Sequence, residues 1–218
     1  MSCPLCYSPS EFLLKAEQRE YHLCTACRLI FVPSRFFITS EKEVERYLEH
    51  ENSLDNEGYV HMFQQKINLI TDYCPNVQTV LDYGCGYEPV LKTLLERTGF
   101  EAEGYDPYFF PEINEGSKYD LIVSTETFEH LKQPGEELEK IVPLLSPHGY
   151  CAVMTQFYPT QNGQLDKLGF LNWYYKRDPT HICFYGPKTF EWIAHHHNFD
   201  MILNNGKDFV ILQKNISS

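Results

Sequence analysis

Apolar and polar positions change their spacing along this chain, and the later part alternates between two patterns. From residue 77 onward, short apolar runs of strand length are followed by segments whose apolar positions recur every three or four residues. The predicted strands are 77–83, 101–106, 119–125 and 150–155, and the predicted helices are 89–97, 135–145 and 187–198. Because strands that alternate with helices form a mostly parallel sheet, we predict an α/β, Rossmann-like fold.

The last two predicted strands, 200–203 and 209–213, are separated by a polar turn that reads NNGK. A short turn with asparagine and glycine is typical of a hairpin between antiparallel strands. The sheet is therefore expected to close with a terminal antiparallel hairpin.

Residues 41–75 show helical spacing instead. An amphipathic segment begins near Glu43, is interrupted at 56–58, and is followed by a segment, 59–73, with one apolar face formed by Val60, Phe63, Ile67 and Ile70. Pro75 ends this segment. We predict a helical cap or linker over 41–75, ahead of a main domain over 76–218.

The first 40 residues contain strand-like pieces that are too short to enclose a core. Four cysteines, Cys3, Cys6, Cys24 and Cys27, form two Cys-x-x-Cys pairs, a pattern typical of zinc sites. We predict a zinc ribbon over 1–40 whose Zn²⁺ is structural, because four thiolates leave no open coordination position. Free thiols or a redox pair are the alternative interpretation.

Charge and hydropathy narrow the possible partners. The chain has 218 residues and a net charge of -12, while its first 40 residues are nearly neutral. An acidic body repels a phosphate backbone, so nucleic acid is not the expected partner. No apolar run reaches the length of a membrane span, and the first residues lack the features of a leader, so a cytoplasmic protein is expected. The oligomeric state is not readable.

The first strand of the α/β part ends in a glycine turn, VLDYGCG at 80–86, and Asp106 ends the next strand. This order is typical of a nucleoside cofactor site at the carboxyl edge of a parallel sheet. Gly84 and Gly86 allow the backbone to approach a ligand closely. We interpret the Cys85 thiol between them as a small filler, because nothing beside it lowers its pKa.

Four motifs together resemble the class I S-adenosylmethionine (SAM)-dependent methyltransferases. They read LDYGCG at 81–86, GYD at 104–106, YDLIVSTETFEHL at 119–131 and LLSPHGY at 144–150. The resemblance covers about residues 77–214, and the terminal hairpin agrees with the reversed strand that ends this fold. The Glu129-His130-Leu131 element is similar to the ubiquinone-biosynthesis and related small-molecule methyltransferases.

Two features distinguish this chain from the sequence patterns of related nucleoside-binding enzymes. Pro89 stands where a dinucleotide-binding enzyme has its third glycine, which argues against a dehydrogenase. The segment 107–118 is too short for a full helix and strand, so we predict that the third β-α unit is reduced to a loop. The acidic residue that often holds the adenine amine in this family is not placed.

The resemblance implies a SAM site in which particular residues contact particular parts of the cofactor. Gly84, Cys85 and Gly86 are expected beside the methionine part, Asp82 near its amino group and Asp106 at the ribose hydroxyls. The helix-capping role open to Asp82 is the alternative interpretation.

The resemblance also implies which residues lie beside the reactive methyl group and which cover the cofactor. Thr125 and Glu126 are expected beside the methyl group, and Tyr59 with Phe63 over the cofactor. A place in the apolar core is the alternative for Tyr59.

Two histidines are candidates for a general base, which helps when the acceptor is a hydroxyl or an acidic carbon. His130 follows the fourth strand, and His181 lies in an aromatic insertion, 156–186, where the acceptor wall is expected. A structural role is the alternative for each. The predicted function is methyl transfer from SAM to an oxygen, carbon or nitrogen atom of a small molecule. A macromolecular methyltransferase that docks through the ribbon, or a non-catalytic SAM-binding scaffold, are the alternatives.

Overall fold

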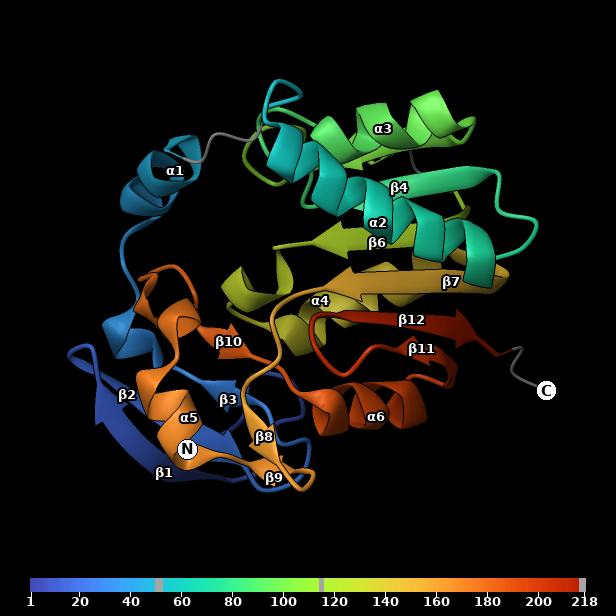
Figure 1. The fold of residues 1–218 in the computed structure, drawn as a ribbon. Coiled ribbons are helices and arrows are strands. Elements are labelled where there is room, and N and C mark those ends of the chain that lie inside the picture. Colours follow the sequence, from blue (N-terminus) through green and yellow to red (C-terminus); the bar gives the residue numbers. More distant parts are fainter. Residues whose placement is uncertain (50–52, 114–115, 216–218) are drawn as a thin grey trace.

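The computed structural model describes residues 1–49, 53–113 and 116–215, and its central layer is a six-stranded sheet (Figure 1). The strand order is β11-β12-β7-β6-β4-β5. Four strands are parallel: β4 (Thr79–Tyr83), β5 (Glu101–Tyr105), β6 (Tyr119–Thr125) and β7 (Leu145–Met154). β12 (Phe209–Lys214) runs antiparallel to both β7 and β11 (Phe199–Asn204). The predicted α/β sheet with a terminal antiparallel hairpin is confirmed.

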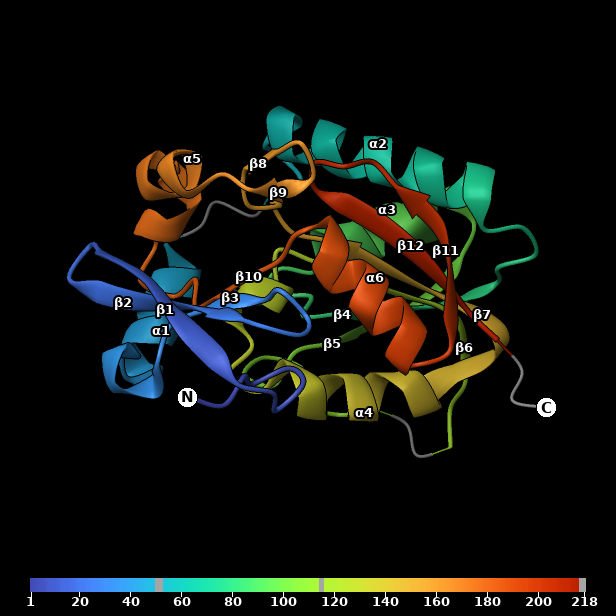
Figure 2. The ribbon, with the colours of Figure 1, turned by 90° about the horizontal axis from the view of Figure 1, so that it is seen from below.

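Helices cover both faces of this sheet (Figures 1 and 2). On one face pack α2 (Glu57–Tyr73) and α3 (Val90–Thr98), and on the other pack α4 (Pro134–Leu144) and α6 (Pro187–His196). Successive strand residues serve opposite faces, as the alternation of side chains along a strand requires. Val80 of β4 joins the α2–α3 core, while Leu81 joins the α4–α6 core.

The junction between α4 and β7 differs from the prediction. The helix ends at Leu144, and the strand begins at Leu145, five residues earlier than expected from the apolar run. Tyr119 pairs with Leu145, and the register then shifts before Leu121 pairs with Tyr150. Residues 146–149, with Pro147 and Gly149, therefore form an irregularity inside the strand, which no periodic pattern reveals.

The predicted loop 107–118 contains residues 114–115, which lie outside the described residues. In its described part, 107–113 and 116–118, there is no helix. An isolated bridge joins Asp106 to Phe110 and folds the start of the loop back on itself. The chain therefore goes from β5 to β6 with its described residues in turns and irregular structure.

A second sheet joins the first residues to the insertion. Strands β1 (Ser10–Ala16), β2 (Arg19–Cys24) and β3 (Ile30–Phe31) are antiparallel, and β10 (Cys183–Phe184) pairs with the open edge of β3. The insertion also holds β8 (Thr160–Gln161), β9 (Gln164–Leu165), α5 (Lys167–Asn172) and the 3-10 helix η3 (Tyr174–Arg177). Figure 1 shows these blue and orange segments side by side. The ribbon and the insertion thus form one structural unit.

The remaining short elements are η1 (Ser34–Phe36), α1 (Ser40–Leu48) and η2 (Phe128–His130). α1 follows the second sheet, and η2 lies directly beyond the end of β6. None of the helices in the described ranges is long and apolar enough to span a membrane.

Candidate functional site

A cavity of about 690 Å³ opens at the carboxyl ends of β4, β5 and β6. The glycine turn, the start of the loop after β5 and the residues after β6 line it, and α1, α2 and the insertion contribute its remaining walls. Every residue predicted to bind the cofactor or to act in catalysis lies on this one surface: Tyr59, Asp82, Gly84, Cys85, Gly86, Asp106, Thr125, Glu126, His130 and His181. The structure therefore brings the whole predicted set together.

The two glycines of the turn have different constraints, although both have positive φ angles, +87° at Gly84 and +69° at Gly86. A Cβ on Gly84 would lie 2.2 Å from Oγ1 of Thr127, so this position has no room for a side chain. A Cβ on Gly86 would meet nothing within 4 Å. The backbone at Gly86 thus borders open cavity, as a close approach to a ligand requires.

Asp82 is 1% exposed, lines the cavity and also accepts a hydrogen bond from the following helix, α3. Its Oδ2 accepts a hydrogen bond from the backbone N–H of Lys92 at 3.2 Å, in the first turn of α3. Its Oδ1 has no hydrogen-bond partner among the described residues. Burial raises the pKa of this carboxyl to about 7. A buried carboxylate oxygen without a partner suits a cationic group placed in the cavity.

Asp106 ties the glycine turn to the loop after β5. Its Oδ2 accepts the backbone N–H of Gly86 at 3.2 Å, and its Oδ1 accepts those of Tyr108 and Phe109 at 2.9 and 3.2 Å. A carboxylate has about four acceptor sites, so capacity for ligand hydroxyls remains. Asp106 therefore shapes the cavity in addition to lining it.

Glu126 and Tyr175 line the cavity, and the fully buried Glu129 lies next to them. Glu126, with φ +51°, and Glu129 both have the Tyr175 hydroxyl within hydrogen-bond distance, at 3.3 Å for Glu126. Burial raises the pKa of both carboxyls above the ordinary value. The nearby charge of Glu129 raises the pKa of Glu126 further. Sequence reasoning missed Glu129 and Tyr175 as site residues, although the Glu-His-Leu motif and the aromatic insertion contain them.

His130 and His181 each have one ring nitrogen, Nδ1, next to a backbone carbonyl. The Nδ1 atom of His130 lies 3.1 Å from the Thr180 carbonyl, and that of His181 lies 2.8 Å from the Tyr175 carbonyl. A carbonyl only accepts, so each Nδ1 carries the proton and donates it. Burial lowers the pKa of both rings, that of His181 to about 3, so both are neutral and each Nε2 has a lone pair. The structural role thus occupies only one nitrogen of each ring.

Helix α1, which falls in the segment 41–75 predicted as a helical cap or linker, contributes Glu43 and Tyr47 to the cavity lining. Its buried Glu43 accepts hydrogen bonds from Lys132 at 2.9 Å and from the Tyr108 hydroxyl at 3.1 Å. The Tyr47 ring lies 5.2 Å from that of His130. Not every tyrosine of the insertion faces the cavity. Tyr158 and Tyr185 are buried in the apolar core, and their hydroxyls donate hydrogen bonds to backbone carbonyls.

Comparison with known proteins decides the family. A sequence model described as "Methyltransferase domain" matches residues 53–204, more than half of the chain. The chain belongs to this methyltransferase family. Its membership confirms the predicted SAM-dependent methyltransferase domain. No curated protein matches the sequence of this methyltransferase.

Solved structures share the fold of this methyltransferase at low sequence identity. An O-methyltransferase family protein from Burkholderia thailandensis is 13% identical, with a TM-score of 0.53, over 79% of this chain and 63% of that one. The plantazolicin methyltransferase BpumL in complex with SAH is 13% identical, with a TM-score of 0.51, over 84% and 93%. The N-methyltransferase NodS from Bradyrhizobium japonicum WM9, in complex with S-adenosylhomocysteine (SAH), is 14% identical, with a TM-score of 0.51, over 79% and 97%.

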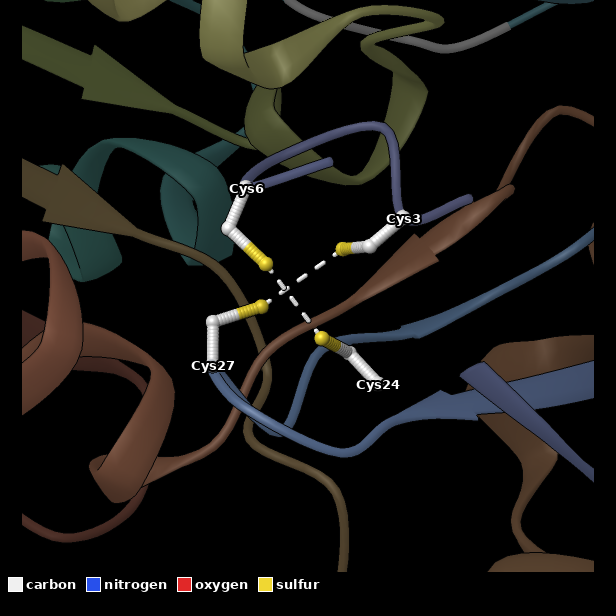
Figure 3. Close-up of side chains that lie close together, drawn as sticks. All are labelled: Cys3, Cys6, Cys24 and Cys27. Atoms are coloured by element: carbon white, nitrogen blue, oxygen red, sulfur yellow. Dashed lines mark hydrogen bonds between the residues drawn. The ribbon is translucent and has the colours of Figure 1, made fainter. Parts of the chain in front are cut away.

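The four ribbon cysteines of this methyltransferase converge on one point (Figure 3). Sγ of Cys3 lies 3.5 Å from that of Cys27, and Sγ of Cys6 lies 3.3 Å from that of Cys24. All four sulfur atoms lie within 4.8 Å of one another. Sulfur atoms on one tetrahedral zinc ion lie about 3.8 Å apart, since each Zn–S bond is about 2.3 Å. The cluster is consistent with a metal site.

We expect Gly86→Ala to weaken SAM binding at least about tenfold while the protein remains folded. The added methyl group meets no protein atom but occupies cavity, and the positive φ costs roughly 1–2 kcal/mol of stability. Gly206→Ala is the matched control, because Gly206 has φ +71°, equally open surroundings and no place in the cavity. Calorimetric titration and thermal melting compare the two variants. Equal SAM affinities would contradict the placement of Gly86.

Proposed function

We propose that this methyltransferase transfers a methyl group from SAM to an oxygen, carbon or nitrogen atom of a small molecule. We also place it near the ubiquinone-biosynthesis type of methyltransferase. The observation that carries the proposal is one cavity in which a glycine turn and two acidic residues face a wall of histidines and carboxyl groups. The first side suits the cofactor, and the second suits an acceptor.

The residues of the first side fit the chemistry of SAM. The unpartnered Oδ1 of Asp82 would hold the ammonium group, and the open backbone at Gly86 leaves room for the methionine part. Asp106 would accept hydrogen bonds from the ribose hydroxyls. Tyr59 and Phe63, whose ring centres are 4.5 Å apart in α2, would cover the cofactor. When bound, SAM supplies a methyl group on a positively charged sulfur atom.

The second side would hold and activate the acceptor. Methyl transfer depends mainly on positioning, and a base helps where the acceptor must lose a proton. His130 and His181 are neutral and keep Nε2 available, so either ring is a candidate to take that proton. Thr125 ends β6 and Glu126 follows it, and both line the cavity, where they would lie beside the reactive methyl group.

A small acceptor is favoured over a macromolecule by what surrounds the cavity. α1 and the insertion both line it, and the Arg46 guanidinium of α1 binds Asp178 of the insertion at 3.0 Å. The ribbon pairs with the insertion through β3 and β10. This edge of the ribbon therefore supports a wall of the cavity and is not available for docking a macromolecule. We propose that a structural Zn²⁺ at Cys3, Cys6, Cys24 and Cys27 maintains this support, since the sulfur spacing fits a tetrahedral ion.

Two measurements test the proposal. Calorimetry of the full chain is expected to give micromolar or tighter binding of SAM and SAH, and a folded protein that binds neither would overturn it. Incubation with methyl-labelled SAM and fractionated cell extract then separates the acceptor classes. Label is expected in the small-molecule fraction, and label only in protein or RNA would favour the macromolecular alternative.

A further inference from the structure

Two histidines that line the cavity meet a buried carboxyl group, and the three residues come from two segments of the chain. Glu129 and His130 belong to η2, and His181 immediately precedes β10 in the insertion. One ligand atom of each residue lies within 4.8 Å of those of the other two. Ligand atoms about 2.0–2.2 Å from one ion lie about 3–4 Å apart, so a small contraction would bring these three to bonding distance.

The hydrogen bonds of the two rings leave the same nitrogen available on each. Nδ1 of His130 and Nδ1 of His181 donate to backbone carbonyls, and neither Nε2 has a hydrogen bond within residues 1–49, 53–113 and 116–215. In metal sites, a ligating histidine almost always donates its other ring N–H to a carbonyl or carboxylate. The surroundings of both rings thus match those of metal ligands.

Glu129 is 0% exposed and supplies the third ligand atom. Its Oε1 accepts from the Tyr175 hydroxyl, and its Oε2 has no hydrogen-bond partner among the described residues. Glu126 adds a second carboxyl group next to it. Buried carboxylates are costly unless they take up a proton or a cation compensates them, so a bound cation would stabilise the ionised form of this pair.

Protein side chains do not provide that charge. The lysines among the described residues that line the cavity are Lys132 and Lys140, and each is already paired. Lys132 binds Glu43 at 2.9 Å, and Lys140 binds Glu137 at 2.7 Å. The two-histidine and one-carboxylate set is also a typical donor set for zinc, iron and related ions, whereas magnesium prefers oxygen ligands alone. A divalent transition-metal cation would suit this donor set and would supply the positive charge.

We propose that Glu129, His130 and His181 bind a divalent transition-metal ion, separate from the ion at the four cysteines. Because three protein ligands leave positions open toward the cavity, the ion can bind a hydroxyl oxygen of the methyl acceptor and favour transfer of its proton to water before the methyl group is transferred. This role rests on the proposed methyltransferase function, whereas metal binding does not. The acceptor class narrows to molecules with a hydroxyl or enol oxygen, and the two histidines act by holding the ion.

Cobalt(II) is the probe for this site, because its visible absorption reports the ligands. The full chain is first loaded with one equivalent of Zn²⁺, which the four cysteines are expected to bind first, and is then titrated with Co²⁺ in the absence of SAM. We expect about one equivalent of Co²⁺ to bind. The bound ion should show visible absorption bands but not the ultraviolet band of cobalt–thiolate bonds. Glu129→Gln, which keeps shape, and His181→Asn are each expected to weaken Co²⁺ binding at least about 100-fold.

His196→Gln is the matched control. The Nδ1 of His196 also donates to a carbonyl, that of Trp192 at 2.9 Å, but this ring is exposed on α6. Its variant should bind Co²⁺ like the unchanged protein. Absence of a Co²⁺ equivalent, or equal binding by Glu129→Gln, would overturn the metal site. SAM calorimetry on the same samples separates the proposals, since retained SAM binding without Co²⁺ binding rejects the metal alone and leaves the histidines as candidate bases.

Discussion

Replacing Asp82 with asparagine is expected to weaken SAM binding about 10- to 100-fold, which is the loss of one or two charge-assisted interactions at about 1.5–3 kcal/mol. The same change should stabilise the ligand-free protein at pH 8. Burial raises the pKa of Asp82 to about 7 in the folded chain, against an ordinary value of 3.8. The fold therefore favours the protonated form, and the ionised form costs it up to about 4 kcal/mol.

The sign of the pH effect follows from this order of pKa values. Below about pH 4 the group is protonated in the folded and unfolded chains, and Asp82 imposes no penalty. As pH rises from about 4 to 7, the unfolded chain loses the proton first, so stability from this group is lost. The gain in melting temperature from Asp82→Asn is thus expected to be clearly smaller at pH 5 than at pH 8, where it should reach several degrees.

Asp120→Asn is the control for Asp82→Asn, because Asp120 has the opposite shift. Burial alone would raise the pKa of Asp120, but hydrogen bonds from the Thr79 and Gln78 amides outweigh it and hold the pKa below its ordinary value. Its variant should lose stability at pH 8 and keep SAM binding. Melting curves at both pH values and SAM calorimetry make the comparison. An Asp82→Asn protein with unchanged SAM affinity would contradict the assignment of the ammonium site.

The second large effect is expected from Cys24→Ser, which should remove the ribbon metal and destabilise the entire methyltransferase. Structural zinc contributes roughly 10–16 kcal/mol to small zinc domains, so loss of one thiolate should cost about 5 kcal/mol or more. Cys24 is fully buried in the same core cluster as Leu81 and Ile122 of the central sheet. One cooperative transition at a much lower temperature is therefore expected, with no separate melting of the ribbon.

Cys151→Ser gives the same chemical change without a metal role. Cys151 lies in β7 and is buried in the same cluster. Burying its hydroxyl should cost only about 1–3 kcal/mol, and zinc content should equal that of the unchanged protein. Metal analysis and calorimetric melting test both variants. Zinc content that is unaffected by Cys24→Ser would contradict the assignment of the thiolate ligands.

Local patterns were sufficient for the cofactor side of the site. The turn 84–86 directly follows an apolar strand, and Asp106 ends the next one, so strand ends alone place them at one edge of the sheet. These residues lie within single segments of recognisable spacing. Their convergence in the cavity therefore needed no knowledge of distant contacts.

The acceptor side depends on contacts between distant segments, and the sequence pattern could not supply them. β3 and β10 are two residues each, which is too short for any periodicity. Their pairing, and the packing of Tyr47 against His130, become visible only in three dimensions. Glu129 is different, because it lies three residues after Glu126 in one short motif, and the two carboxyl groups are close enough for the charge of Glu129 to raise the pKa of Glu126. The spacing of these two glutamates in the motif was a readable signal.

The pairing of β3 with β10 has a consequence for synthesis of the chain. The ribbon strands are made first, yet their sheet gains its last strand only when Cys183 and Phe184 leave the ribosome. Until then the edge of β3 has unpaired backbone groups, and such edges invite pairing with other chains. Early capture of zinc by the four cysteines would hold the nascent ribbon in shape during this interval. We therefore expect zinc starvation to cause aggregation chiefly while the protein is being made, and much less after it has folded.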